Sequence, residues 1–145
     1  ITRMIDRAMA DLGRADLRSA DLTGADFRGA NFKEARFEDA KVEGANLRGA
    51  DLSGVDLRSA QFARADLSRA DLRLSDLSQA DLRAADLRGA DLSGAYLARA
   101  SLHSAMLHGA DLRRVDLSGA DLQGARGDFF WDDATRWPSD FGPRG

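Results

Sequence analysis

The side chains that could carry chemistry in this sequence are its aspartates and its two histidines. An aspartate recurs at five-residue intervals through most of the chain, and His103 and His108 are separated by the same interval. Carboxylate pairs can serve as general acid and base, but here they form an evenly spaced series rather than one singular pair in a cleft. Histidines five apart make no recognised metal pair, and no cysteine completes a site. We therefore expect no catalytic, cofactor-binding or metal-binding residues, and no enzymatic activity.

The spacing of these residues reflects a five-residue unit, Ala-Asp-Leu-x-x, which occurs 23 times without insertion over residues 10–124. Its central residue is Leu12 in the first copy and Leu122 in the last. On an α-helix, five residues turn about 500°, so successive leucines would spiral around the axis. On a flat strand, the odd period would send alternate leucines to opposite sides. Neither regular element alone buries this pattern.

A four-sided coil does bury it. The alanine and leucine of one repeat are two residues apart, so both point the same way from a short extended segment. If the chain turns a corner of about 90° after each repeat, four repeats close one coil, and stacked coils pair as parallel strands. The 23 repeats then make about 5–6 coils, since 23/4 is 5.75. The sequence predicts an all-β, four-sided parallel β-solenoid.

Tandem copies of Ala-Asp-Leu-x-x over residues 10–124 resemble the pentapeptide-repeat family. The resemblance implies that the solenoid is a right-handed quadrilateral β-helix. It does not imply a single activity, because the family serves several roles. Some members are quinolone-resistance proteins, rods of about DNA's width with a strongly negative surface that act on DNA gyrase. The stretch from Asp133 to Pro138, followed by Phe141-Gly-Pro, is similar to the tails of bacterial members.

Residues 20 apart should stack on the same side of this coil. Five central residues are not leucine, namely Phe27, Phe32, Phe37, Val42 and Phe62. The first three occupy three sides of one coil, and Phe62 is expected over Val42. Large over small keeps the core volume constant, so we interpret the pattern as core packing rather than a ligand cavity. Ser75 replaces an inward alanine and is expected to be a buried hydroxyl bonded to a nearby carbonyl.

One side of the coil carries a predicted acidic ladder, consisting of Asp11, Asp51, Asp71, Asp91 and Asp111 together with Asn31. Like charges about 5 Å apart repel, so we expect compensation by neighbouring arginines or turn amides. The ladder is either a solvated, self-compensating face or a charge-patterned docking surface. Residues 10–124 contain 19 acidic and 16 basic side chains, within a formal net charge of −3 for the chain. This balance argues against a basic nucleic-acid binder, so no direct nucleic-acid partner is expected.

The outward position before the central residue departs from Asp or Asn at six places, namely Arg36, Lys41, Gln61, Tyr96, Ser101 and Met106. The last three lie in consecutive repeats and are accompanied by His103 and His108. An outward tyrosine and methionine on a charged rod predict a protein contact surface. The predicted partner surface comprises Tyr96, Ser101, Met106, His103 and His108. Sequence drift in a tolerant repeat explains the same residues.

The flanks, residues 1–9 and 125–145, are expected to cover the exposed coil ends. Apolar residues at helical spacing within 1–9 are compatible with a short capping helix. The segment 125–145 concentrates aromatic residues, namely Phe129, Phe130, Trp131, Trp137 and Phe141. These residues either cap the last coil or form the seam of an end-to-end homodimer. We therefore expect a monomer or an end-to-end homodimer.

Two functions are compatible with the sequence. The first is a rigid, non-enzymatic protein-interaction scaffold or binding module with a protein partner. The second, implied by the resemblance, is a DNA mimic that binds DNA gyrase or another topoisomerase and protects or inhibits it. The 16 basic side chains of residues 10–124 nearly cancel the 19 acidic ones, which disfavours the mimic.

The compartment and the ends of the chain also lead to expectations. No apolar run is long enough for a membrane span or a signal peptide, and cysteine is absent, so we expect a cytoplasmic protein without a membrane partner. Because the sequence begins with Ile1, we expect it to come from a longer chain.

Overall fold

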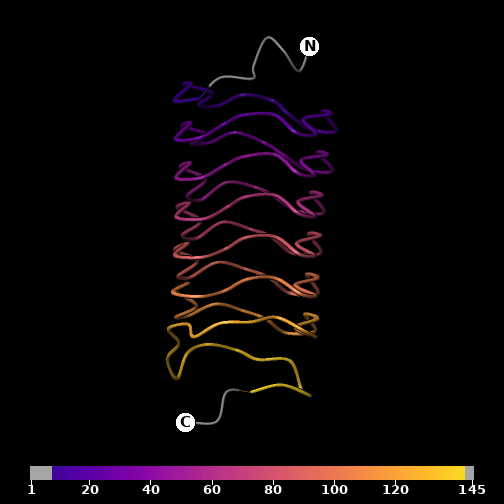
Figure 1. Ribbon diagram of the computed structural model, residues 1–145, viewed down its shortest axis with the longest axis vertical. Helices are drawn as coiled ribbons and strands as arrows, with labels where there is room; N and C mark the ends of the chain where they lie inside the picture. Colours follow the sequence, from indigo (N-terminus) through magenta and orange to yellow (C-terminus); the bar gives the residue numbers. More distant parts are fainter. Residues whose placement is uncertain (1–7, 143–145) are drawn as a thin grey trace.

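Residues 8–142 of the chain are described by a computed structural model, and they form a rod of stacked coils (Figure 1). This part of the chain contains no helix and no strand longer than a single bridging residue. Each repeat contributes one β-bridge, at the residue before its central residue, and then a two-residue turn. All the bridges are parallel, and with one exception they join positions 20 residues apart, which is the length of four repeats, from Asp11–Asn31 to Asp116–Arg136. Four repeats therefore complete one coil, and the fold is a parallel β-solenoid.

A regular set of backbone hydrogen bonds connects the coils and closes the turns. The Leu52 N–H donates to the Asp71 carbonyl of the next coil at 2.8 Å, and the Asp71 N–H donates back to Ala50 at 2.9 Å. Within the repeat, the Val55 N–H donates to the Leu52 carbonyl at 3.2 Å. The turn closed by this bond has a positive φ at its second central residue, Gly54, which is the signature of a type II turn.

The second turn residue has a positive φ in every repeat from residue 14 to residue 124. The angle lies between +64° and +74° where this residue is glycine, and between +56° and +63° where it carries a side chain. Left-handed backbone is unfavourable for residues with a Cβ, so the non-glycine turns are held by the surrounding ladder of hydrogen bonds.

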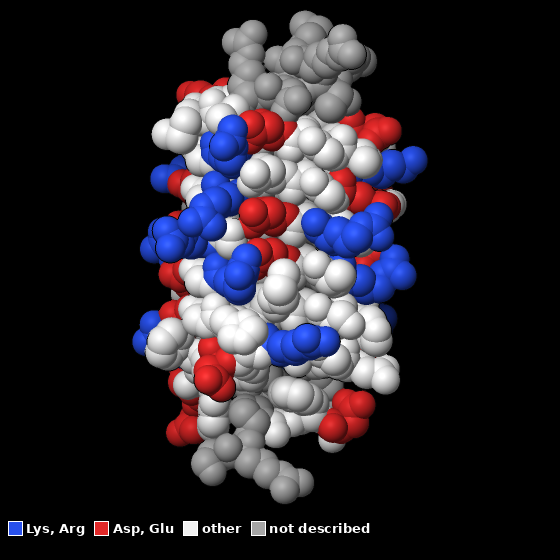
Figure 2. Space-filling view, viewed as in Figure 1, with Lys and Arg blue, Asp and Glu red and all other residues white. Residues whose placement is uncertain are grey.

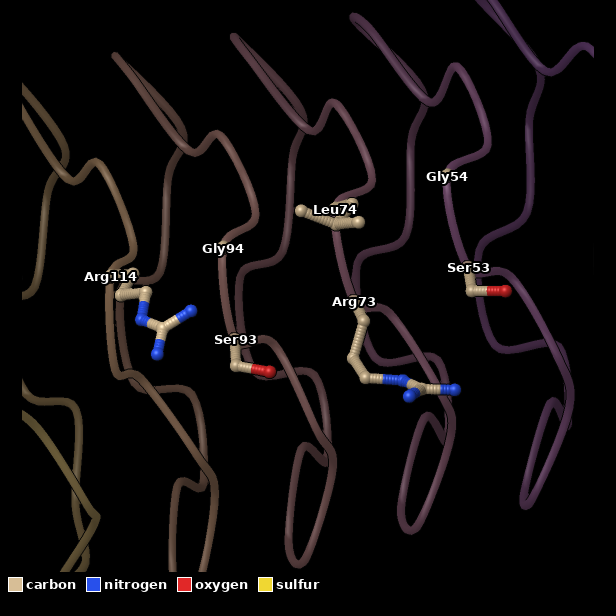
Figure 3. Close-up of a pocket in the computed structure, with 7 residues that line it drawn as sticks. All are labelled: Ser53, Gly54, Arg73, Leu74, Ser93, Gly94 and Arg114. Carbon is tan, nitrogen blue, oxygen red and sulfur yellow. The ribbon is translucent and has the colours of Figure 1, made fainter.

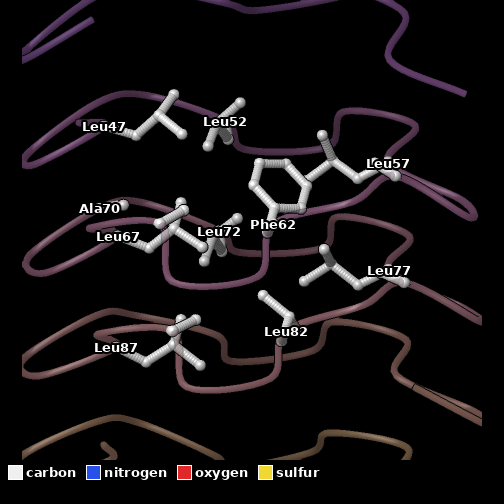
Figure 4. Close-up of a cluster of buried hydrophobic side chains, with 14 of the residues drawn as sticks. Leu47, Leu52, Leu57, Phe62, Leu67, Ala70, Leu72, Leu77, Leu82 and Leu87 are labelled. Atoms are coloured by element: carbon white, nitrogen blue, oxygen red, sulfur yellow. The ribbon is translucent and has the colours of Figure 1, made fainter. Parts of the chain in front are cut away.

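The core is a filled stack of apolar side chains from all four sides (Figure 4). Phe27, Phe32 and Phe37 are 0 % exposed, and their rings meet nearly edge to face at centroid distances of 5.2 and 5.0 Å. The Lys41–Gln61 bridge places Phe62 over Val42, both fully buried. The predicted alternation of large and small core residues is confirmed.

Ser75 is a second confirmed core prediction. Its side chain is fully buried, and its hydroxyl donates to the Leu72 carbonyl at 2.7 Å. The hydrogen bond satisfies the hydroxyl inside an otherwise apolar column.

The coil path continues beyond Gly124, where the repeat has ended. Arg126 pairs with Met106 and Arg136 with Asp116, both at the same separation as the bridges of the repeat. Phe130 pairs with Asp111, one position short of that separation, and is the exception noted above. At the other end, the helix predicted for residues 1–9 lies outside the described residues apart from Ala8 and Met9, which form a turn.

Candidate functional site

The aspartates of the repeat serve first as hydrogen-bond acceptors for the backbone of the turns. In each of the 17 repeats with Asp or Asn before the central residue, the side-chain oxygen accepts the backbone N–H two residues later. In one such turn, the Ser53 N–H donates to Asp51 Oδ1 at 3.1 Å. This local bond is the Asx turn that Asp and Asn form more readily than other residues.

The residue two positions after each aspartate decides how much charge the repeat shows to solvent. Seven aspartates receive a two-pronged arginine, through Nε on Oδ1 and Nη2 on Oδ2, in the pairs Asp16–Arg18, Asp26–Arg28, Asp56–Arg58, Asp71–Arg73, Asp81–Arg83, Asp86–Arg88 and Asp111–Arg113. In six others the residue two positions later is Ser or Thr, whose hydroxyl donates to the carboxylate. Asp-Leu-Arg is therefore a locally neutral unit, whereas Asp-Leu-Ser keeps a net negative charge.

The arginine pairs hold their carboxylates ionised. The hydrogen bond from Arg58 lowers the pKa of Asp56 to about 2, and that from Arg18 lowers the pKa of Asp16 to about 2. On the face shown in Figure 2, acidic and basic side chains lie interspersed rather than in large areas of one sign.

The predicted acidic ladder does stack in one column, through the bridges from Asp11 to Asp111. Its charges are compensated from within the same side of the rod. Arg73 lies 2.6 Å from Asp71 and 3.9 Å from Asp91, and Lys33 lies 3.5 Å from Asp51. Four of its five carboxylates, those of Asp51, Asp71, Asp91 and Asp111, thus have a basic side chain within 4.0 Å, and the two alternatives for this face stay predictions.

The predicted partner surface is spread around one coil. Tyr96 bridges to Asp76 and Asp116, whereas Ser101 and Met106 bridge within two other columns. Tyr96 is 53 % exposed, while Ser101 and Met106 are half-buried. These residues therefore face three different directions, and a flat partner cannot touch all of them.

The two histidines lie on neighbouring sides of the coil, as their sequence positions indicate. His103 Nδ1 is 4.0 Å from Asp121 Oδ2, and His108 is exposed. Among residues 8–142 no group of three or more His, Cys, Asp or Glu side chains could hold a metal ion. In the same range, no helix has the length and apolar character needed to cross a bilayer, and the cytoplasmic location stays a prediction.

The aromatic residues of the tail surround Trp137. Its ring centroid lies 5.7 Å from Phe129, 6.3 Å from Trp131 and 5.4 Å from Phe141. Phe129 and Trp137 pack against the core, whereas Phe130 is 61 % exposed. The cluster thus both contacts the last coil and shows aromatic surface to solvent, and the choice between cap and dimer seam stays open.

One exposed residue, Leu74, is missed by the predicted partner surface. It is 66 % exposed and is the one large apolar side chain at the second turn position within residues 10–124. Leu74 lies between Gly54 and Gly94 of the neighbouring coils, in a depression of about 490 Å³ bounded by Arg73 and Arg114 (Figure 3). The signal is present in the sequence, because the other turn residues in this column are charged or glycine.

The coil geometry and its repeat define a class of protein, the pentapeptide β-solenoids. The sequence model described as "Pentapeptide repeats" matches in 8 copies, over residues 10–49, 43–79, 80–119 and 97–126. This chain belongs to the pentapeptide-repeat family, whose fold is a right-handed β-helix. No match is found among the curated proteins.

Solved structures of pentapeptide-repeat proteins are similar to this chain. HetL, from Nostoc sp. strain PCC 7120, is 40 % identical with a TM-score of 0.40, covering 85 % of this chain and 64 % of its own length. Rfr23, from Cyanothece 51142, is 31 % identical with a TM-score of 0.44, covering 70 % of this chain and 63 % of its own. This chain therefore spans slightly less than two thirds of either protein.

A third similar structure is that of QnrB1, which is described as a plasmid-mediated fluoroquinolone resistance protein. It is 22 % identical with a TM-score of 0.64, and the match covers 81 % of this chain and 67 % of QnrB1. At this level of identity the match shows a shared fold.

Proposed function

We propose that this protein is a rigid, non-enzymatic scaffold that binds a partner protein through outward-facing side chains that depart from the repeat. The observation that carries the proposal is that the carboxylates of the repeat already bind backbone N–H groups and arginines of the rod itself. All 15 aspartates of the repeat position accept a turn N–H, and seven also hold an arginine. The aspartates are thereby accounted for by the fold, and the apolar departures Leu74 and Tyr96 are not.

The solenoid suits such a role because its surface is pre-organised. Each coil is bonded to the next by backbone hydrogen bonds on all four sides, so an outward side chain has a fixed place in its column. Binding to a rigid surface loses little conformational entropy, which favours affinity from a small contact.

The topoisomerase alternative requires a surface that imitates the phosphates of duplex DNA. The paired arginines interrupt such a surface, because seven of the 15 aspartates are neutralised within their own repeat. We expect the protein, at micromolar concentration, neither to inhibit supercoiling by DNA gyrase nor to rescue it from a quinolone. Inhibition or rescue would instead support the DNA mimic.

The scaffold proposal can be tested with a photo-crosslinking amino acid at the same turn position on four successive corners of the rod. Arg69, Leu74, Gln79 and Ala84 share this position, all with φ between +56° and +61°. After irradiation of cells of the source organism, we expect a discrete protein adduct from at least one of the four positions. If none of them yields an adduct, the scaffold proposal is wrong.

A further inference from the structure

Two of the large apolar side chains exposed to solvent lie in the repeat array, on either side of Gly94 along the path of the coils. Leu74 is 66 % and Tyr96 is 53 % exposed, and the remaining ones among residues 8–142 lie in the flanks. A Cβ on Gly94 would lie 2.8 Å from Leu74 Cδ2, and Tyr96 follows Gly94 by two residues. Leu74 thus covers Gly94, and Tyr96 follows on the adjacent side of the same coil as Gly94.

The backbone gives Leu74 no structural reason to be leucine. Its φ is +59°, a left-handed conformation that favours glycine, and Gly54 and Gly94 hold the same position in the coils on either side. Nothing lies within 4 Å of the place a Cβ would take on Gly54. Leu74 therefore lies beside an open surface over Gly54. This surface, which we call the glycine shelf, is part of the depression of about 490 Å³ (Figure 3).

The two arginines at this corner, Arg73 and Arg114, differ in whether they form ion pairs. Arg114 lines the depression, and among residues 8–142 its guanidinium forms no ion pair, although the Asp132 carboxylate accepts the Arg114 backbone N–H at 3.1 Å. Arg73, which lines the same depression, forms ion pairs with Asp71 and Asp91. A partner carboxylate beside Arg114 would complete a charge pair that the rod itself leaves open.

We propose that the corner formed by Leu74, Gly94 and Tyr96, with Arg114 at its rim, is the docking surface of the scaffold. It takes a protein segment that presents an apolar side chain next to a carboxylate. The apolar side chain lies on the glycine shelf against Leu74 and Tyr96, and the carboxylate pairs with Arg114. This inference rests on the proposed scaffold function and locates its contact surface.

The test is a titration of the ¹⁵N-labelled protein with two blocked peptides, followed by NMR. The probe is acetyl-Asp-Leu-Phe-Glu-amide, and the control probe is acetyl-Lys-Leu-Phe-Lys-amide, which has the same apolar residues and the opposite charge. We expect the acidic peptide to shift the amide signals of Leu74, Gly94 and Tyr96 and to bind about tenfold more tightly than the basic peptide.

Two matched glycine variants and one charge variant locate the effect. Leu74→Gly should abolish the shifts, and it removes a left-handed non-glycine residue, so the variant is expected to fold. Gln79→Gly makes the same change on the next corner, at a φ of +61°, and should bind the acidic peptide as the wild type does. Arg114→Gln should equalise the affinities for the two peptides.

Three results would overturn the docking surface: no shift at roughly 5 mM acidic peptide, shifts centred on the aromatic tail, or unchanged binding by Leu74→Gly. If one of these occurs while the four-corner crosslinking still yields an adduct, the scaffold function stands and its surface lies elsewhere. If the crosslinking also fails, the proposed scaffold function is wrong as well.

Discussion

Each aspartate of the repeat has two separable tasks. It accepts the N–H that closes its Asx turn, and, where an arginine follows, it forms an ion pair. Asn31 and Asn46 perform the first task and not the second, since their Oδ1 atoms accept the turn N–H of Lys33 and Arg48. Changing an aspartate to asparagine should therefore alter surface charge while keeping the turn.

The ion pair can be measured directly at Asp56. Its pKa lies at about 2, below the ordinary value of 3.8, chiefly because Arg58 donates to its carboxylate. In Arg58→Gln we expect the pKa of Asp56 to rise toward its ordinary value in a carboxyl-carbon NMR titration. Arg83→Gln, on a different side of the coil, should leave it unchanged. A pKa near 2 in Arg58→Gln would contradict the assigned cause.

The same pair predicts how stability depends on pH. Because the folded pKa of Asp56 is depressed, its contribution is fully present above the unfolded pKa of about 4. The contribution is lost as the pH falls from about 4 to about 2. Wild type should therefore lose more stability than Arg58→Gln over this range, as measured by urea unfolding at each pH.

The left-handed turn residues provide another prediction. Leu74→Gly should raise the free energy of unfolding by roughly 0.5–1 kcal/mol, because glycine adopts a φ of +59° without a steric penalty. Ala60→Gly, at a buried inward position, is the control and should be destabilising. Urea unfolding of the three proteins tests both signs, and a less stable Leu74→Gly would refute the interpretation of the turn.

The core columns are the part of the fold that the sequence predicts best. A strict period places every inward residue, so the neighbours of Phe32 and the stacking of Phe62 on Val42 follow from counting. The tail is different, because its bridges no longer follow a repeat. Phe130 pairs with Asp111 one position short of the regular separation, and no period in the sequence predicts that shift.

Phe32 tests the packing of the core. It contacts the rings of Phe27 and Phe37 and is fully buried. Phe32→Ala should lower the free energy of unfolding by about 3–5 kcal/mol, and Phe32→Leu by only about 1 kcal/mol, since leucine is the usual occupant of this position. Equal losses in denaturant unfolding would contradict the volume-matched core.

The tail can be tested at Trp137. Trp137→Ala removes the ring on which Phe129, Trp131 and Phe141 converge, and it should cost about 2 kcal/mol. Phe130→Ser changes a mostly exposed side chain and should stay within about 0.5 kcal/mol. Sedimentation of both variants at several concentrations reports the oligomeric state. A dimer lost only in Phe130→Ser would favour the seam, whereas a monomer destabilised only in Trp137→Ala would favour the cap.

The sequence predicts the interior of the rod better than its surface. The period predicts the solenoid, and counting by 20 would have placed Leu74 next to Gly94 and near Tyr96. The sequence also predicts that neighbouring arginines compensate the aspartates, but counting cannot supply the exposure of each side chain or the ion pairs that join adjacent coils. Those properties depend on rotamers and on neighbours in adjacent coils, such as the contact of Arg73 with Asp91.

The central claim is that the corner at Leu74, rather than the aspartate columns, makes the contact with the partner. The most direct measurement fixes the photo-crosslinking amino acid at position 98, two residues after Tyr96, and compares adduct yield between Leu74→Gly and Asp71→Asn. Asn replaces Asp at positions 31 and 46 of the same repeat, so Asp71→Asn should keep its turn. We predict that Leu74→Gly loses the adduct and Asp71→Asn retains it. Loss in Asp71→Asn with retention in Leu74→Gly would contradict the account.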